Sequence, residues 1–464
     1  MHMKRRTLLI PTLTVITLLL IGILIIWLVN EQPIKHRTTV EPSNNTTDQP
    51  SPNIVTIESD VIVADVSKFD LEKESHYNLS YSGNTWKIFF TNDYSKTSIL
   101  NITGSTIRYS DTFGNTILAY KTPSDFFREK TIVSTDLTKI SLLMRKRKPS
   151  VTEPTPDEGI LVTQEFNNNY PWIASSIAFS KEGDIAYIAK KYGRISLFIN
   201  YEPVGALPYA SENHSAYELV FSKNNEDLFI ILNGRKPRVS HLYKVRYRET
   251  NKKIDVIHST YSIDEFVENG NNYAFTEHFS ETSDQNLVVD GNLILTKRHI
   301  ALLTMNGSGT VAYLSCKTKY FDKCDQIYVD ETLFPVQGFV SRPLIITPSE
   351  LPAYKIVLQK ETATPAPESW NVYRLVIGKE VVSDSYDGIG KPVFFATGNM
   401  AFEVVESDDI YAPRHRFMMI NGQKSEEYDW VWGPVLSDDG ASVIYAARKG
   451  NSIYRITKKI DEDF

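Results

Sequence analysis

The two cysteines of this chain are the first and last residues of a nine-residue segment, and their spacing suits a structural disulfide. Cys316 and Cys324 flank the segment CKTKYFDKC. Apolar runs on both sides predict two strands of a hairpin, and opposed cysteines in a hairpin can approach to about 5.5 Å between Cα atoms. An oxidising outer compartment favours the bond, whereas a reducing lumen or cytosol would leave two thiols. Redox catalysis typically uses C-x-x-C, which is absent. We therefore predict a Cys316–Cys324 disulfide.

Three aromatic residues alternate in the segment EYDWVWGP, namely Tyr428, Trp430 and Trp432. Alternate residues of a strand point to the same side, so these three side chains are predicted to share one face. If exposed, they would form a flat platform that binds a sugar or a peptide. If buried, they would pack between sheets. Burial is favoured because aromatic side chains at strand spacing usually serve the core.

The sequence lacks the signatures of common catalytic and cofactor sites. Its nine histidines show neither H-E-x-x-H nor another zinc-ligand spacing, and there is no G-x-S-x-G elbow, Walker A loop or dinucleotide fingerprint. No catalytic residue, metal or cofactor is predicted. The formal net charge of -6 argues against a nucleic-acid partner, because proteins that bind nucleic acid usually carry a basic surplus.

Short strands are the elements that must position these residues. The stretch from Trp172 to Gly205 indicates three of them, Ser176–Phe179, Ile185–Ala189 and Ile195–Asn200, joined by the turns SKEGD and KKYGR. β-branched and aromatic residues fill the strands, and Gly, Lys and Asp fill the turns. A unit this small cannot bury its apolar faces alone, so neighbouring copies are needed to complete the core.

The middle strand of this unit recurs along the chain at intervals of about 40–47 residues, a spacing that fits a four-stranded propeller blade. Its centres are Ala186-Tyr187, Leu228-Phe229, Tyr273-Ala274, Ala312-Tyr313, Lys355-Ile356, Ala401-Phe402 and Ile444-Tyr445. These repeats predict an all-β chain folded as a β-propeller.

The turn before the middle strand recurs as well. Phe179–Gly183 (FSKEG) matches Phe221–Asn225 (FSKNN) and Leu436–Gly440 (LSDDG), and a Ser followed by acidic, Asn or Gly residues closes a hairpin by side-chain-to-backbone hydrogen bonds. Third strands end alike in LFIN and MMING. In these residues the chain resembles the TolB-type, WD40-like β-propeller repeats, over roughly two thirds of its length. The resemblance implies a propeller fold.

We expect about seven to eight four-stranded blades over this length. Residues 60–147 are β-rich and are expected to supply first blades or to close the ring, residues 148–159 to form a loop, and residues 160–464 to hold the clear repeats. The β-rich part contains Trp86–Thr91, Thr116–Tyr120 and Lys139–Met144, and Ile140-Ser141 falls one period before the first marker strand.

An apolar run near the N-terminus predicts a membrane anchor. Leu8 to Val29 is uncharged and follows Lys4, Arg5 and Arg6. It is long enough to cross a hydrocarbon core of about 30 Å and longer than the apolar stretch of a cleaved signal peptide. The basic flank favours a cytoplasmic N-terminus. We therefore predict a cytoplasmic stub and transmembrane helix over residues 1–29 and a disordered linker over residues 30–59.

Together these features predict a single-pass membrane protein whose propeller lies outside the cytoplasm and binds a protein or glycan partner. Propeller blades present loops around a central channel, and such loops carry recognition. A binding or assembly module is the favoured function. The alternatives are a propeller-fold enzyme of the glycoside hydrolase or lyase type, with carboxylates at the channel mouth, and a structural envelope protein without a specific ligand.

Overall fold

The computed structural model describes most of the chain beyond residue 84 and one earlier strand. The described residues are 61–65, 85–111, 113–147, 158–211, 214–234, 239–278, 280, 285–317, 324–336, 338–361, 369–407 and 414–460. The anchor predicted over Leu8–Val29 and the predicted linker lie outside these ranges. Within the ranges, no helix has the length and apolar character needed to span a membrane.

Every regular element of the described residues is a strand, and the strands are listed here in chain order. The first group is β1 (Val61–Asp65), β2 (Thr85–Phe90), β3 (Thr97–Thr103), β4 (Thr106–Asp111), β5 (Thr116–Lys121), β6 (Phe126–Val133), β7 (Ile140–Lys146), β8 (Gly159–Val162), β9 (Asn167–Tyr170), β10 (Ile173–Phe179), β11 (Ile185–Lys191), β12 (Arg194–Ile199) and β13 (Glu202–Ala206). The second group is β14 (His214–Phe221), β15 (Asp227–Gly234), β16 (Ser240–Arg246), β17 (Ile254–Thr260), β18 (Ser262–Glu268), β19 (Tyr273–His278), β20 (Gln285–Val289), β21 (Asn292–Met305), β22 (Val311–Cys316), β23 (Cys324–Val329) and β24 (Thr332–Pro335). The last group is β25 (Phe339–Ile346), β26 (Pro352–Glu361), β27 (Ser369–Ile377), β28 (Glu380–Val381), β29 (Gly388–Ile389), β30 (Val393–Phe394), β31 (Met400–Glu406), β32 (His415–Ile420), β33 (Gln423–Lys424), β34 (Trp430–Leu436), β35 (Ser442–Lys449) and β36 (Ser452–Lys459).

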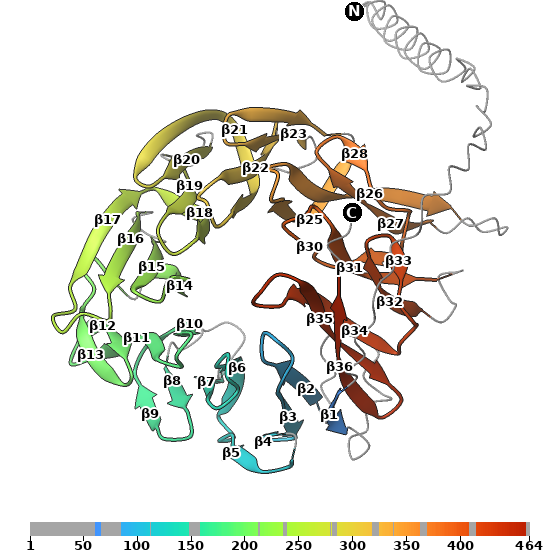
Figure 1. Cartoon of the computed structure of the whole chain (residues 1–464). Coiled ribbons are helices and arrows are strands. Elements are labelled where there is room, and N and C mark those ends of the chain that lie inside the picture. Colours follow the sequence, from blue (N-terminus) through green and yellow to red (C-terminus); the bar gives the residue numbers. More distant parts are fainter. Residues whose placement is uncertain are drawn as a thin grey trace, which may run out of the picture. The chain divides into compact units, whose positions relative to one another are not determined.

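The described residues form nine blades of antiparallel strands arranged around a centre (Figure 1). Blades 1 to 4 contain β2–β5, β6–β9, β10–β13 and β14–β17. Blades 5 and 6, β18–β21 and β21–β24, share the long strand β21. Blade 7 contains β25–β28, blade 8 β29–β33, and blade 9 β34–β36 with β1. The predicted all-β propeller is confirmed, whereas the expectation of about seven to eight blades was wrong.

The extra blade comes from the β-rich part before the clear repeats. β2 to β5 form a complete sheet of their own, and the centre of its second strand is Ile99-Leu100. This pair lacks the aromatic residue that marks most of the other second strands, so the sequence pattern did not reveal it. The seven marker pairs all lie on second strands, as predicted, from Tyr187 on β11 to Tyr445 on β35.

Neighbouring blades are held together by apolar clusters, and strand alternation divides each blade's side chains between its two neighbours. On β11, Ala186 and Ile188 pack toward blade 4, whereas Tyr187 and Ala189 pack toward blade 2. The ring of Tyr187 stacks on that of Phe198 with the ring centroids 5.0 Å apart. Each sheet therefore completes the core of the sheets on both sides, as the repeat pattern predicted.

The first and last blades of the described chain meet and close the ring. β1 pairs antiparallel with β36, so a strand from the beginning of the chain completes the blade that ends it. Phe90 of blade 1 packs on Trp432 of blade 9, with ring centroids 4.8 Å apart. The hydroxyl of Tyr94 in blade 1 donates to the carbonyl of Gly433 in blade 9.

The turn predicted from the repeated serine has the expected hydrogen bonds. The backbone N–H of Asp184 donates to Ser180 Oγ at 2.9 Å, and that of Asp227 donates to Ser222 Oγ at 3.0 Å. Gly183 has a φ of 81°, a left-handed conformation that glycine adopts without steric cost. These turns fix the register between the first and second strands of their blades.

Candidate functional site: an axial hollow

The first strands β10, β14, β18 and β25 lie toward the centre of the ring in Figure 1, and residues from five consecutive blades line a hollow. Its volume is about 620 Å³. Its walls are formed by Glu218 of β14, residues 264–267 of β18, residues 302–306 in and just after β21, residues 342–346 of β25 and Lys391, which precedes β30. Because residues from blades 4 to 8 meet at this one place, we take it as the candidate site and call it the axial hollow.

Irregularities in the first strands present these residues to the hollow. The pairing register shifts between Ile263 and Phe266 in β18, between Ala301 and Thr304 in β21, and between Ser341 and Ile345 in β25. A β-bulge leaves residues outside the regular ladder and changes the direction of their side chains. The residues within these shifts line the hollow, among them Glu265, Leu302 and Arg342.

One ion pair crosses the hollow between blades 5 and 7. Arg342 Nη2 lies 3.0 Å from Glu265 Oε1. The other oxygen of the same carboxylate, Glu265 Oε2, accepts a hydrogen bond from the backbone N–H of Leu303 in blade 6 at 2.6 Å. Glu265 therefore connects three blades. Arg342 is largely exposed, so a ligand can reach its guanidinium group.

A second carboxylate of the hollow, Asp264, is held by several donors. Asp264 Oδ2 accepts a hydrogen bond from Gln285 Nε2 at 2.8 Å and lies 3.0 Å from His278 Nε2. Asp264 Oδ1 accepts from Ser262 Oγ at 2.8 Å. These contacts fix the orientation of the side chain. With Glu218 and Lys391 in the lining, the hollow presents acidic and basic groups to the same space.

A half-buried acid lies in blade 8. Glu403 of β31 lies 3.5 Å (Oε1) from Arg416 Nη1 of β32. Burial raises the pKa of the Glu403 carboxyl, and Arg416 and Lys355 act in the opposite direction. The guanidinium carbon of Arg416 is 3.8 Å from the ring centroid of Trp430, a cation–π contact. Gly390 leaves room for the acid, because a Cβ there would lie 2.9 Å from Glu403 Cβ.

Residues from two further blades approach this acid. Lys355 Nζ of blade 7 donates to the carbonyl of Ile389 at 2.9 Å, and burial lowers its pKa while Glu403 raises it. Burial, with the charge of Glu403 as a second cause, raises the pKa of Tyr94 in blade 1 to about 12. We call Glu403, Arg416, Trp430 and Lys355 the Glu403 cluster.

The three alternating aromatic residues of blade 9 do not share one environment. Tyr428 is buried in the cluster between blades 8 and 9, where its ring meets that of Tyr445 edge-on. Trp432 packs toward blade 1 on Phe90, and Trp430 lies under Arg416. Both tryptophans are half-buried. The ring centroids of Trp430 and Trp432 are 6.4 Å apart, so these two remain adjacent.

The two cysteines lie away from the axial hollow, in blade 6. Cys316 ends β22, Cys324 begins β23, and the two are opposite one another in the strand pairing. In the structure their sulfurs are bonded. Cys316 belongs to the apolar cluster between blades 6 and 7. The bond therefore joins the second and third strands of this blade at one end.

Sequence reasoning did not identify the residues of the axial hollow or the Glu403 cluster. Their spacing matches no motif, because they come from several different blades. The described residues of these two places can recognise a ligand by charge, hydrogen bonding and aromatic contact. Among the described residues, no group of three or more His, Cys, Asp or Glu side chains is placed to hold a metal ion.

Comparisons with known proteins give structural likenesses at low identity. No family model and no curated protein matches the sequence. A crystal structure of the eukaryotic initiation factor is 9% identical, with a TM-score of 0.47, over 76% of this chain and 90% of that one. Oligogalacturonate lyase in complex with manganese is 11% identical, with a TM-score of 0.32, over 83% and 99%. The β-propeller domain of the Trilobed protease from Pyrococcus furiosus is 10% identical, with a TM-score of 0.33, over 73% and 96%.

Proposed function

We propose that this chain is a binding module that holds a polar segment of a glycan or protein partner in the axial hollow. We also propose that Leu8–Val29 anchors it in a membrane with the propeller outside the cytoplasm, and that its repeats are of the TolB type. The observation that carries the binding proposal is the hollow itself. Five blades supply acidic, basic and apolar side chains to one space of about 620 Å³, a size typical of ligand sites.

The contacts of the acids favour binding over catalysis. Glu265 and Asp264 accept hydrogen bonds from neighbouring blades or strands, and these bonds hold the two carboxylates in place. The carboxylates can then accept hydrogen bonds from donor groups of a ligand. Arg342 is suited to carboxylate, hydroxyl or carbonyl groups of a ligand because its guanidinium carries several donors in one plane. A ligand that follows the hollow would contact several blades at once, as expected of an assembly module.

One observation favours the enzymatic alternative. Glu403 has a raised pKa, as a general acid of a glycoside hydrolase or lyase would, and its partner Arg416 lies against Trp430. Glycoside hydrolysis by the usual route needs a second carboxyl group about 5–10 Å away. The charged groups that act on Glu403 are instead the cations Arg416 and Lys355. This difference makes binding the preferred function.

The test uses the purified full-length protein on arrays of defined oligosaccharides and synthetic peptides. We expect a discrete set of ligands to bind, and Arg342→Ala to weaken them about tenfold, because a hydrogen bond to a charged group contributes roughly 1.5 kcal/mol. Arg246→Ala is the matched control, because it removes an exposed arginine from β16, outside the hollow.

Two results would contradict the binding proposal. One is the absence of any saturable ligand, which would favour the structural alternative. The other is binding that Arg342→Ala and Arg246→Ala affect equally. Cleavage of an array oligosaccharide that is lost in Glu403→Gln would establish the enzymatic alternative instead.

A further inference from the structure

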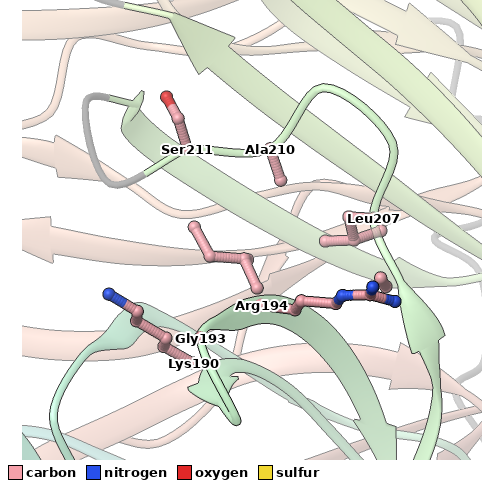
Figure 2. A pocket seen from close by; sticks show the side chains of 8 residues that line it. Lys190, Gly193, Arg194, Leu207, Ala210 and Ser211 are labelled. Atoms are coloured by element: carbon pink, nitrogen blue, oxygen red, sulfur yellow. The ribbon is translucent and has the colours of Figure 1, made fainter.

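A second hollow lies on blade 3, away from the axial hollow. It opens between the hairpin of β11 and β12 and the segment that follows β13, and its volume is about 590 Å³ (Figure 2). Its described lining residues are Lys190, Gly193, Arg194, Ile195, Ala206, Leu207, Ala210 and Ser211. We call it the blade 3 hollow. It shares no lining residue with the axial hollow, so its role is independent of the function proposed above.

The described lining carries two positive charges and no acidic side chain. Figure 2 shows Lys190 and Arg194 reaching different sides of the space, with the hydroxyl of Ser211 across from them. This local excess of positive charge occurs in a chain whose formal net charge is -6. A concave surface lined by one sign of charge attracts a ligand of the opposite sign.

The hairpin that supplies these cations places like charges directly opposite each other. Lys191 and Arg194 are partners in the strand pairing, and Lys190 is the next residue. The two residues of the turn, Tyr192 and Gly193, have φ values of 51° and 78°, as a tight two-residue hairpin requires. Like charges at opposed positions destabilise a strand pair. An anion bound beside the hairpin would offset this repulsion.

The floor and rim of the hollow suit an apolar group beside the anion. Ile195 and Leu207 are buried and belong to the apolar cluster between blades 3 and 4. Tyr192 and Tyr209, the chain neighbours of the lining residues Gly193 and Ala210, have side chains that are 92% and 72% exposed, among the most exposed large apolar side chains of the described residues. Exposed aromatic side chains next to an apolar floor are typical of ligand sites.

We propose that the blade 3 hollow binds an organic phosphate, that is, a phosphate group joined to a small apolar group. Two cations suit the charge of a phosphate monoester, about −1.5 to −2 at pH 7, better than a single carboxylate charge. The guanidinium of Arg194 can donate two parallel hydrogen bonds to phosphate oxygens, and Lys190 acts as a point charge. The apolar group would rest on Ile195 and Leu207.

Calorimetric titration of the full-length protein tests the proposal with three probes. These are hexyl phosphate, inorganic phosphate and monomeric dihexanoyl phosphatidic acid, whose head group is also a phosphate monoester. We expect hexyl phosphate to bind more tightly than inorganic phosphate, because only hexyl phosphate covers the apolar floor. Arg194→Ala and Lys190→Ala should each weaken hexyl phosphate about tenfold. Binding of the short-chain lipid with the same dependence on Arg194 would identify a lipid head group as the source of the phosphate.

Lys181→Ala is the matched control, because Lys181 is an exposed lysine in the turn between β10 and β11, at the opposite end of the same blade. It should leave hexyl phosphate binding unchanged. Unaltered thermal unfolding of all three variants would show that the blade is intact. The proposal is overturned if no probe binds saturably, if Arg194→Ala has no effect, or if Lys181→Ala weakens binding as much as Arg194→Ala.

Discussion

Glu403 occupies a position on the second strand that carries a buried aliphatic side chain in other blades. It follows the marker residue Phe402, as Ile188 follows Tyr187 in blade 3 and Ile230 follows Phe229 in blade 4. Ile188 and Ile230 are fully buried between blades. A carboxyl group at this place is partly removed from water, which disfavours its charged form. Arg416 offsets that cost only in part, at a distance of 3.5 Å.

The raised pKa of Glu403 predicts a specific dependence of stability on pH. Because the folded state holds this proton more tightly than the unfolded state, the contribution of Glu403 to stability is fully present below its ordinary pKa of 4.5. It is lost as the pH rises through the raised pKa. The Glu403→Gln variant has no titratable group at this position. Its stability relative to that of the natural protein should therefore increase as the pH rises above 4.5.

Denaturant unfolding of both proteins in steps between pH 4 and pH 8 measures this difference. Parallel stability curves over that range would contradict the assignment of a raised pKa to Glu403. Glu226→Gln serves as a control for the removal of one carboxyl group at an exposed turn.

At the scale of the elements, one strand departs from the repeat that the sequence suggests. β21 runs from Asn292 to Met305 and pairs with β20 through its first half and with β22 through its second half. It thereby serves as the last strand of blade 5 and the first strand of blade 6. The marker strands of these two blades were still recognisable in the sequence, because Tyr273 and Tyr313 lie on other strands.

The disulfide gives a prediction at the same scale. Replacing Cys316 and Cys324 by serine should lower the free energy of unfolding by about 2–3 kcal/mol, because the bond restricts the unfolded chain over a short loop. Chemical denaturation of the protein with and without a reductant measures the effect. The double serine variant should show no further change on reduction, and an unaltered stability of the natural protein on reduction would contradict the prediction.

Most second strands could be predicted from the sequence because they combine apolar residues with an aromatic centre. The second strand of blade 1 could not be predicted in this way, yet the turn that precedes it carries a different sequence signal. The backbone N–H of Lys96 donates to Thr91 Oγ1 in blade 1, and that of Lys139 donates to Ser134 Oγ in blade 2. These are the hydrogen bonds of the repeated serine turn, with Thr91 replacing the serine in blade 1. A search for a Ser or a Thr that is followed closely by an acidic residue would have identified both blades in the sequence.

The site was harder to predict than the fold for a physical reason. Its residues lie on first strands with shifted register, where the alternation of inward and outward side chains is interrupted. Glu265 and Arg342 are 77 residues apart in the sequence and meet only in the folded propeller. No local pattern carries that information.

At the scale of the whole molecule, the ring is closed where its first and last blades meet. The seam between the first and last blades contains the Phe90–Trp432 contact and the hydrogen bond from Tyr94 to Gly433. Strand β1 secures it by pairing with β36, so that Asp65 is opposite Ser452. β1 therefore places a strand from the beginning of the chain in the blade that ends it.

The pairing of β1 with β36 is therefore the feature to measure. In the double variant Asp65→Cys and Ser452→Cys, the opposed Cα atoms of an antiparallel pair lie about 4.5–5.5 Å apart, within the range of a disulfide. We expect mass spectrometry of the oxidised, protease-digested full-length protein to find this crosslink. The control pair Asp65→Cys and Ser442→Cys, which places the second cysteine on β35, should give none. Absence of the first crosslink, or equal yields from both pairs, would contradict the closed ring.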